Sequence, residues 1–155
     1  GGIALDLADT DSLAAARGFS AALLLTPIGP DESEVGIAAV RALRGAGVRR
    51  IVYLAIMNLE AMRAIPHFEA KIPIKDEVLA DGRSVVVEAN FFQSNDRMIL
   101  PAIMGAGDYP LPVGEAGVWS VAPADLGQAC ANALVKDDWA GQAVPLCGPE
   151  RLTGQ

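Results

Sequence analysis

Short apolar runs alternate along the chain with stretches in which apolar residues recur at helical spacing. The apolar runs predict strands at residues 3–7, 21–27, 50–56, 84–89, 118–122 and 143–148. The stretches between them predict helices at residues 10–18, 32–47, 65–82, 90–105 and 124–135. This alternation predicts an α/β fold, in which a parallel sheet carries helices on both faces.

The length of the chain fits one domain, spanning residues 1–155. Apolar residues make up 52% of the chain and aromatic residues only 5%, so the core is expected to be aliphatic. We find no internal repeat and no domain boundary. The Pro- and Gly-rich stretch at 106–117 is either a lid or a rigid surface connection.

The charge of the chain argues against two classes of binding partner. A net charge of −7 argues against binding to nucleic acid or to an anionic membrane surface.

No apolar run approaches the ~20 residues of a membrane span. The acidic start shows no signal peptide. The first residue is not Met, so the chain is expected to be a fragment or a processed form.

The two cysteines, Cys130 and Cys147, lie far apart, and with a single histidine they have no zinc-site spacing. We predict no metal site. The cysteines are expected to be free, buried thiols in a reducing compartment, which favours a cytoplasmic location.

The only histidine, His67, precedes Lys71 by four residues. On one helix this spacing places both side chains on the same face. The pair is either a proton-transfer device, because histidine titrates near neutral pH, or an ordinary helix face. Pro73 would kink a continuous helix, unless it is the first residue (N1) of a new helix, with residues 67–71 forming only a turn. In that case the shared face of His67 and Lys71 is lost.

Six segments follow one another in an order that identifies a family. They are DLADTDSLAAARG from Asp6, ALLLTP, GVRRIVYLA, IPHFEAK, VVVEANFFQSN and AVPLCGPERLTG. In this order they resemble the NmrA-like family, the atypical short-chain dehydrogenases/reductases. The resemblance covers nearly the whole chain and implies a Rossmann-like, NAD(P)-binding domain.

The resemblance also shows what the sequence lacks. The family begins with a strand, a glycine-rich turn and a helix that hold the cofactor pyrophosphate, but this chain contains no G-x-G-x-x-G. The chain is expected to begin at the family's third strand, without the first two strands. In the strand order 3-2-1-4-5-6 their loss leaves a gap in the middle of the sheet. Either an N-terminal part was lost, or the sheet closes differently, or another chain fills the gap.

The resemblance implies a set of cofactor-binding positions. They are Asp6 and Leu7 at the adenine edge, Leu25, Thr26 and Pro27 at the end of the fourth strand, Ala55 at the end of the fifth, Lys71 at the ribose, and Asn90, Phe91 and Phe92 around the nicotinamide. Asp6 could instead cap a helix, and one of the two phenylalanines could belong to the core.

Two of these positions depart from the family's catalytic pattern. His67 stands where the larger superfamily has a catalytic Tyr, so the resemblance makes His67 and Lys71 the catalytic candidates. Ala55 stands where many active relatives have Ser or Thr, whose hydroxyl can polarise a carbonyl. Asn58 could substitute for that hydroxyl, or could simply cap the next segment.

Three functions follow as hypotheses. The first is an NAD(P)H-dependent reductase of a small, flat acceptor such as a quinone. The second is a non-catalytic NAD(P) sensor that binds a regulatory protein, and Ala55 and His67 favour it. The third is an interaction module that binds no dinucleotide. The choice between NADH and NADPH, the acceptor and any homo-oligomer remain open at this level.

Overall fold

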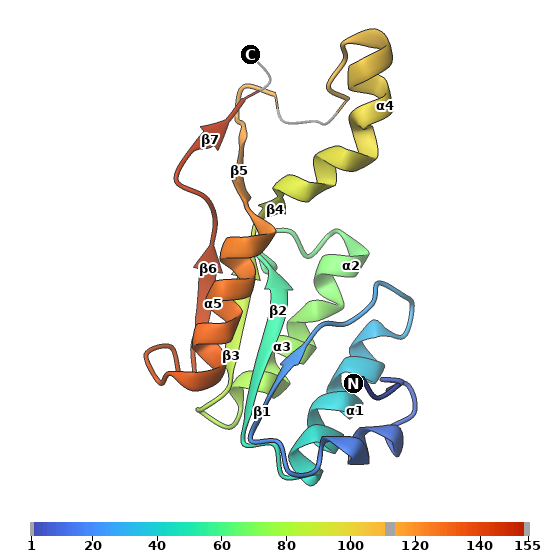
Figure 1. The fold of residues 1–155 in the computed structure, drawn as a ribbon, viewed down its shortest axis with the longest axis vertical. Coiled ribbons are helices and arrows are strands. Elements are labelled where there is room, and N and C mark those ends of the chain that lie inside the picture. Colours follow the sequence, from blue (N-terminus) through green and yellow to red (C-terminus); the bar gives the residue numbers. More distant parts are fainter. Residues whose placement is uncertain (1, 111–113, 154–155) are drawn as a thin grey trace.

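A four-stranded parallel sheet forms the centre of the molecule (Figure 1). The computed structural model describes residues 2–110 and 114–153. The strands lie in the order β1-β2-β3-β6, with bounds Ala21–Leu24, Arg50–Ile56, Val85–Ala89 and Ala143–Leu146. Each neighbouring pair is parallel. The predicted α/β fold with a parallel sheet is therefore confirmed.

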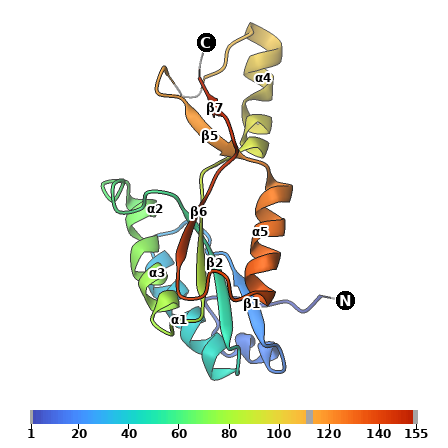
Figure 2. The ribbon, with the colours of Figure 1, turned by 90° about the vertical axis from the view of Figure 1, so that its left-hand side faces the viewer.

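Helices cover both faces of this sheet (Figure 2). One face carries α1 (Glu32–Gly45) and α3 (Lys71–Leu79), and the other carries α5 (Pro123–Val135). Alternate residues of a strand point to opposite faces, so β2 serves two cores. Ile51 and Tyr53 pack on the α1 and α3 side, whereas Val52 packs on the α5 side.

A small second sheet lies above the carboxyl ends of the main strands. It consists of β4 (Phe91–Phe92), β5 (Val118–Val121) and β7 (Arg151–Leu152). The short turn η2 (Gln93–Asn95) and helix α4 (Asp96–Ala106) connect β4 to β5. The helix predicted over 90–105 therefore begins late. Phe91 and Phe92 instead pair with β5, a contact with residues far along the chain. Residues 111–113 of the predicted loop lie outside the described residues.

The strand predicted at residues 3–7 does not form, and this prediction is wrong. No described strand lies beyond β1, which pairs only with β2. An extended segment without a neighbour has no ladder of hydrogen bonds, and Ile3 and Leu5 are 68% and 49% exposed. The helix predicted at 10–18 shortens to the 3₁₀ turn η1 (Ser12–Ala16).

The helix predicted over 65–82 divides into two. Helix α2 (Pro66–Glu69) ends before α3 begins at Lys71. Pro73 lies in the first turn of α3, where its missing N–H would have no partner within the helix. His67 and Lys71 therefore lie on different helices, and the shared face expected of a single helix is absent.

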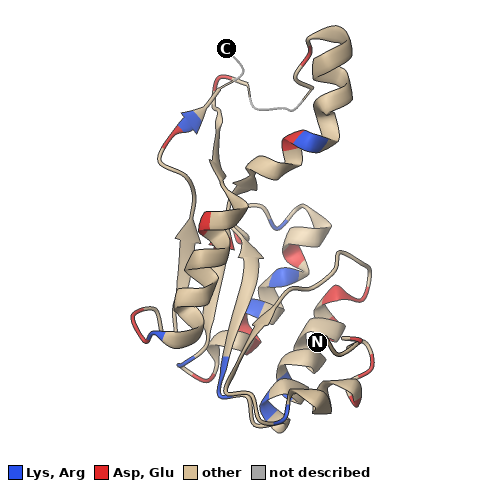
Figure 3. Ribbon diagram, in the orientation of Figure 1, with Lys and Arg blue, Asp and Glu red and all other residues tan. Residues whose placement is uncertain are grey.

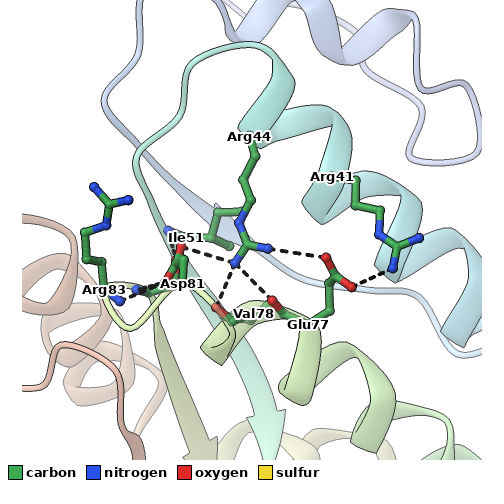
Figure 4. A network of polar contacts seen from close by, with 8 residues as sticks. Arg41, Arg44, Ile51, Glu77, Val78, Asp81 and Arg83 are labelled. Atoms are coloured by element: carbon green, nitrogen blue, oxygen red, sulfur yellow. Dashed lines mark hydrogen bonds and ion pairs between the residues drawn. The ribbon is translucent and has the colours of Figure 1, made fainter.

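A polar network fixes α3 at the end of the sheet opposite the cleft described below (Figure 4). Arg44 of α1 donates to the carbonyls of Glu77 and Val78 at 2.9 and 3.0 Å and pairs with Asp81 at 3.1 Å. The Ser84 hydroxyl donates to Asp81 at 2.7 Å and accepts the Ile51 N–H at 2.9 Å. The network therefore joins α1, the end of α3, β2 and the residue that precedes β3.

The cysteines are both free, as predicted, but only Cys130 is buried. Cys147 is exposed because it follows β6 in the connection to β7, outside both cores. Over residues 2–110 and 114–153, no helix combines the length and apolar character needed to cross a bilayer.

Candidate functional site

A cleft of about 480 Å³ opens between the carboxyl ends of the main sheet and the small sheet. Its lining comes from segments far apart in sequence. They are Ile28, Ala55, Ile56, Met57, Asn58, Met62, His67, Phe68, Ala89, Asn90, Phe91, Phe92, Asn95 and Val118. Five residues predicted for the site meet here, namely Ala55, His67, Asn90, Phe91 and Phe92.

The topology explains why these residues meet. Strands β2 and β3 are parallel neighbours, so the residues that follow them emerge at the same edge of the sheet. The Met57 N–H donates to the Ala89 carbonyl at 3.0 Å, and this bond holds the two strand ends together. Ligands of open α/β sheets bind at this edge. The small sheet then adds Phe91, Phe92 and Val118 as the opposite wall.

The lining is neutral. Of the described residues that line the cleft, none is Asp, Glu, Lys or Arg. Glu88, near the end of β3, is paired with Lys75 at 2.6 Å. Beyond the cleft, α4 carries charge only in its first turn, at Asp96 and Arg97 (Figure 3). Because a charged ligand pays for lost hydration unless it finds a partner, this cleft favours an uncharged one.

His67 enters the cleft from α2, which begins with Pro66 at its first position. Its ring meets that of Phe68 edge to face, with centroids 4.6 Å apart and an interplanar angle of 60°. The imidazole therefore lies among aromatic and thioether groups. It is the only titratable side chain among the described lining residues.

Asn90 is held in one orientation. Its backbone N–H donates to the Leu146 carbonyl at 3.0 Å, and its side-chain Oδ1 accepts the Phe91 N–H at 2.7 Å. The Nδ2 group is thereby turned toward Met57 Sδ, at 3.6 Å. A thioether is a weak acceptor, so this amide donor stays available to a better one.

Lys71 lies outside the cleft lining, in a buried polar cluster. Its Nζ pairs with Glu32 and lies 3.2 Å from the Thr26 hydroxyl. The Thr26 hydroxyl donates to Glu32 at 2.6 Å and lies 3.1 Å from the Tyr53 hydroxyl. Burial raises the pKa of Tyr53, so its phenol is neutral here. The predicted site residues Lys71 and Thr26 are therefore brought together with each other, but not with His67.

A second hollow of about 280 Å³ collects the predicted adenine-edge residues. Asp6, Leu7 and Pro27 line it, beside the start of α1. The Asp6 carboxylate accepts the Ala8 N–H at 2.9 Å, so it shapes a local turn and caps no helix. Leu25, between this hollow and β1, is exposed.

The described residues offer no cradle for a pyrophosphate. No glycine-rich turn joins a strand to a helix among residues 2–110 and 114–153. The long helix that begins near the second hollow is α1, which follows Asp31 and carries Glu32 and Glu34 in its first turn. Glu32 is paired with Lys71, but the Asp31 and Glu34 carboxylates interact favourably with the helix dipole themselves and would repel a phosphate.

Several residues of the cleft were not predicted from the sequence, among them Met57, Met62 and Phe68. Met57 directly follows β2, so its position after a strand was the signal that could have found it. Met62 reaches the cleft through a turn in which its N–H bonds to the Asn58 carbonyl at 3.1 Å. No pattern of apolar residues marks such a turn.

Comparison with known proteins agrees with this architecture. The chain is 28% identical over 156 residues to an NAD(P)H azoreductase of Xenophilus azovorans, covering 96% of this chain and 53% of that protein. It is 30% identical over 145 residues to a (4-alkanoyl-5-oxo-2,5-dihydrofuran-3-yl)methyl phosphate reductase of Streptomyces griseus, covering 91% of this chain and 50% of that protein. No family model matches the chain.

Among solved structures, an NADPH-dependent quinone oxidoreductase of Escherichia coli, complexed with NADPH, superposes with a TM-score of 0.79 at 19% identity. The match covers 96% of this chain and 53% of that one. The chain has a Rossmann-like fold. It spans about half the length of the curated relatives that it matches.

Proposed function

We propose that the protein is an NAD(P)H-dependent reductase of a small, flat acceptor such as a quinone, of the NmrA-like kind. The observation that carries this proposal is the neutral cleft, which unites Ala55, His67, Asn90, Phe91 and Phe92 at the ligand-binding edge of the sheet. The relatives support it, because the curated proteins are named as reductases and the superposed structure holds NADPH.

The chain offers sites for both ends of a dinucleotide but not for its middle. The hollow at Asp6, Leu7 and Pro27 would take the adenine end, and the aromatic cleft would take the nicotinamide and the acceptor. The pyrophosphate would need backbone donors from outside the described residues. When bound, NAD(P)H supplies a hydride, that is, two electrons and one proton.

A quinone that accepts a hydride needs one further proton to become a hydroquinone. His67 can supply it, because it is the titratable side chain of the cleft. Phe91 and Phe92 would exclude water and hold a flat ring by stacking. Lys71, buried beside Glu32, would help to position the part of the chain that binds the cofactor and would not carry the proton.

The relatives' names describe three different acceptors, an azo compound, a furanone phosphate and a quinone. The lining favours the uncharged acceptors over the phosphate ester, since the described lining holds no Lys or Arg that could pair with a phosphate.

A second function, an NAD(P) sensor without turnover, is favoured by Ala55. Its methyl group stands in the cleft where a hydroxyl could polarise a carbonyl. A sensor would bind NAD(P)H and a regulatory protein but would not oxidise the cofactor.

The deciding experiment is NADPH and NADH oxidation with a panel of neutral quinones and azo dyes, using the wild-type chain and His67→Gln. A reductase should show acceptor-dependent oxidation, and loss of a positioned acid should lower kcat by about 10²-fold, with KM little changed. Binding of NAD(P)H without turnover would select the sensor. Absence of binding by a folded chain would sink both functions.

A further inference from the structure

We propose that the Asn58 carboxamide is the hydrogen-bond donor that holds the carbonyl oxygen of a neutral aromatic ligand in the cleft. The proposal rests on the proposed function in one respect, that the cleft takes the acceptor. It assigns to Asn58 the polarising role for which Ala55 has no group.

The backbone of Asn58 is the first observation. Its φ is +61°, and no other non-glycine residue has a positive φ in the part of the chain that the structure describes. Such a conformation costs on the order of 1 kcal/mol for most residues, although Asn tolerates it better than others. Strained residues of this kind gather at ligand sites, so the position calls for an explanation.

The surroundings of Asn58 are the second observation. The preceding residue, Met57, is fixed to the Ala89 carbonyl, and the Asn58 carbonyl accepts the Met62 N–H. The backbone is thereby anchored at Met57 and at Asn58 itself. Asn58 itself lines the cleft and remains exposed, so its amide can reach a ligand.

The chemistry of the lining is the third observation. The described lining has no Lys, no Arg and no hydroxyl, and its polar side chains are Asn58, His67, Asn90 and Asn95. Asn90 already gives its oxygen to the Phe91 N–H and turns its amide toward Met57. Asn58 and Asn90 follow adjacent strands and both line the cleft, and of these two amides Asn58 is the donor that no described side chain engages.

A competing explanation is that Asn58 is only a turn residue, chosen because Asn accepts a positive φ. The variant Asn58→Gly separates the two explanations. Glycine adopts this backbone without strain, so the fold is kept, but the carboxamide is removed. Asn58→Asp keeps the shape and the turn and replaces the donor with an acceptor.

The test is equilibrium dialysis of the chain with 2,3-dimethyl-1,4-naphthoquinone and, as a matched ligand, 2,3-dimethylnaphthalene. The methyl groups block addition of the exposed thiol of Cys147 to the quinone. Losing one hydrogen bond should weaken quinone binding by roughly three- to tenfold in both variants. Affinity for the hydrocarbon, which has no oxygen, should not change.

Unchanged quinone affinity in Asn58→Gly would overturn the proposal, and so would equal losses for quinone and hydrocarbon. Failure of the wild-type chain to bind either ligand would overturn it as well. The measurement uses no cofactor. Quinone binding that depends on Asn58, together with absent NAD(P)H oxidation, would therefore refute the reductase and leave this inference standing.

Discussion

The buried pair of Lys71 and Glu32 allows a sharp test of what holds α1 against α3. The Lys71 side chain is 7% exposed and that of Glu32 is 0% exposed. In Lys71→Met, the Glu32 carboxylate would keep only the Thr26 hydroxyl, at 2.6 Å, as a partner. Removing one member of a buried pair costs about 3–5 kcal/mol, and the remaining hydrogen bond points to the lower end, about 3 kcal/mol.

The assay is urea denaturation of the wild type, Lys71→Met, Glu32→Met and the double variant. Thermal unfolding of the same four proteins checks the result, because a loss of ~3 kcal/mol lowers Tm by about 10 °C for a chain of this size. Each single variant leaves one buried charge behind, whereas the double variant leaves none. Thr26 and Tyr53 can still bond to each other in the double variant, at 3.1 Å in the native structure.

The double variant should therefore be more stable than either single variant. A double-mutant cycle should give a coupling energy of about 3 kcal/mol or more. Additive losses, or a single variant that costs less than ~1 kcal/mol, would refute the view that the pair is buried and mutually dependent. The result also bears on the predicted ribose contact, because a lysine so held has little freedom to leave its partner.

Two further predictions concern other parts of the fold. Burial alone would raise the pKa of Asp81, but hydrogen bonds from Ser84 and Arg83 and the charge of Arg44 lower it below the ordinary 3.8. The stability that this carboxylate contributes is complete above pH 3.8 and is lost as the pH falls through the lowered pKa. In an acid titration, Asp81→Asn should therefore lose stability less steeply than the wild type below about pH 4. In Gly36→Ala, the new methyl group would meet Ile74, with Cγ1 at 2.7 Å, and the overpacking should outweigh the ~1 kcal/mol of helix propensity. Thermal unfolding should show a lower Tm, and Gly36→Ala combined with Ile74→Val should recover part of it.

The elements that the sequence predicted well are those whose own residues decide them. The apolar run at 50–56 became β2 with the same bounds, and the amphipathic stretch from Glu32 became α1. Pro73 indicated that His67 and Lys71 lie on separate segments, although α3 begins at Lys71 and not at Pro73. In these cases local pattern and final packing agree.

The predictions that failed concern elements whose formation depends on pairing with residues far away in the sequence. The apolar segment at 3–7 has strand composition, but no described neighbour gives it a ladder. Phe91 and Phe92 are paired by β5, and β7 exists because Val118 and Trp119 pair with it. The positions of Met57 and Met62 in the cleft likewise depend on the turn that follows β2. Sequence patterns report a residue's own preference, whereas these contacts depend on which strands are present.

The unpaired edge of β1 has a consequence for how the isolated chain behaves in solution. One side of Ala21–Leu24 is hydrogen-bonded to β2, and no described strand covers the other side. Leu23 and Leu25 are exposed along the same segment. Such an edge is a template for any strand that meets it, including the edge of another copy. Mutual repulsion from the net charge of −7 opposes that encounter, and salt weakens the repulsion. The colloidal stability of the chain should therefore depend on ionic strength and concentration.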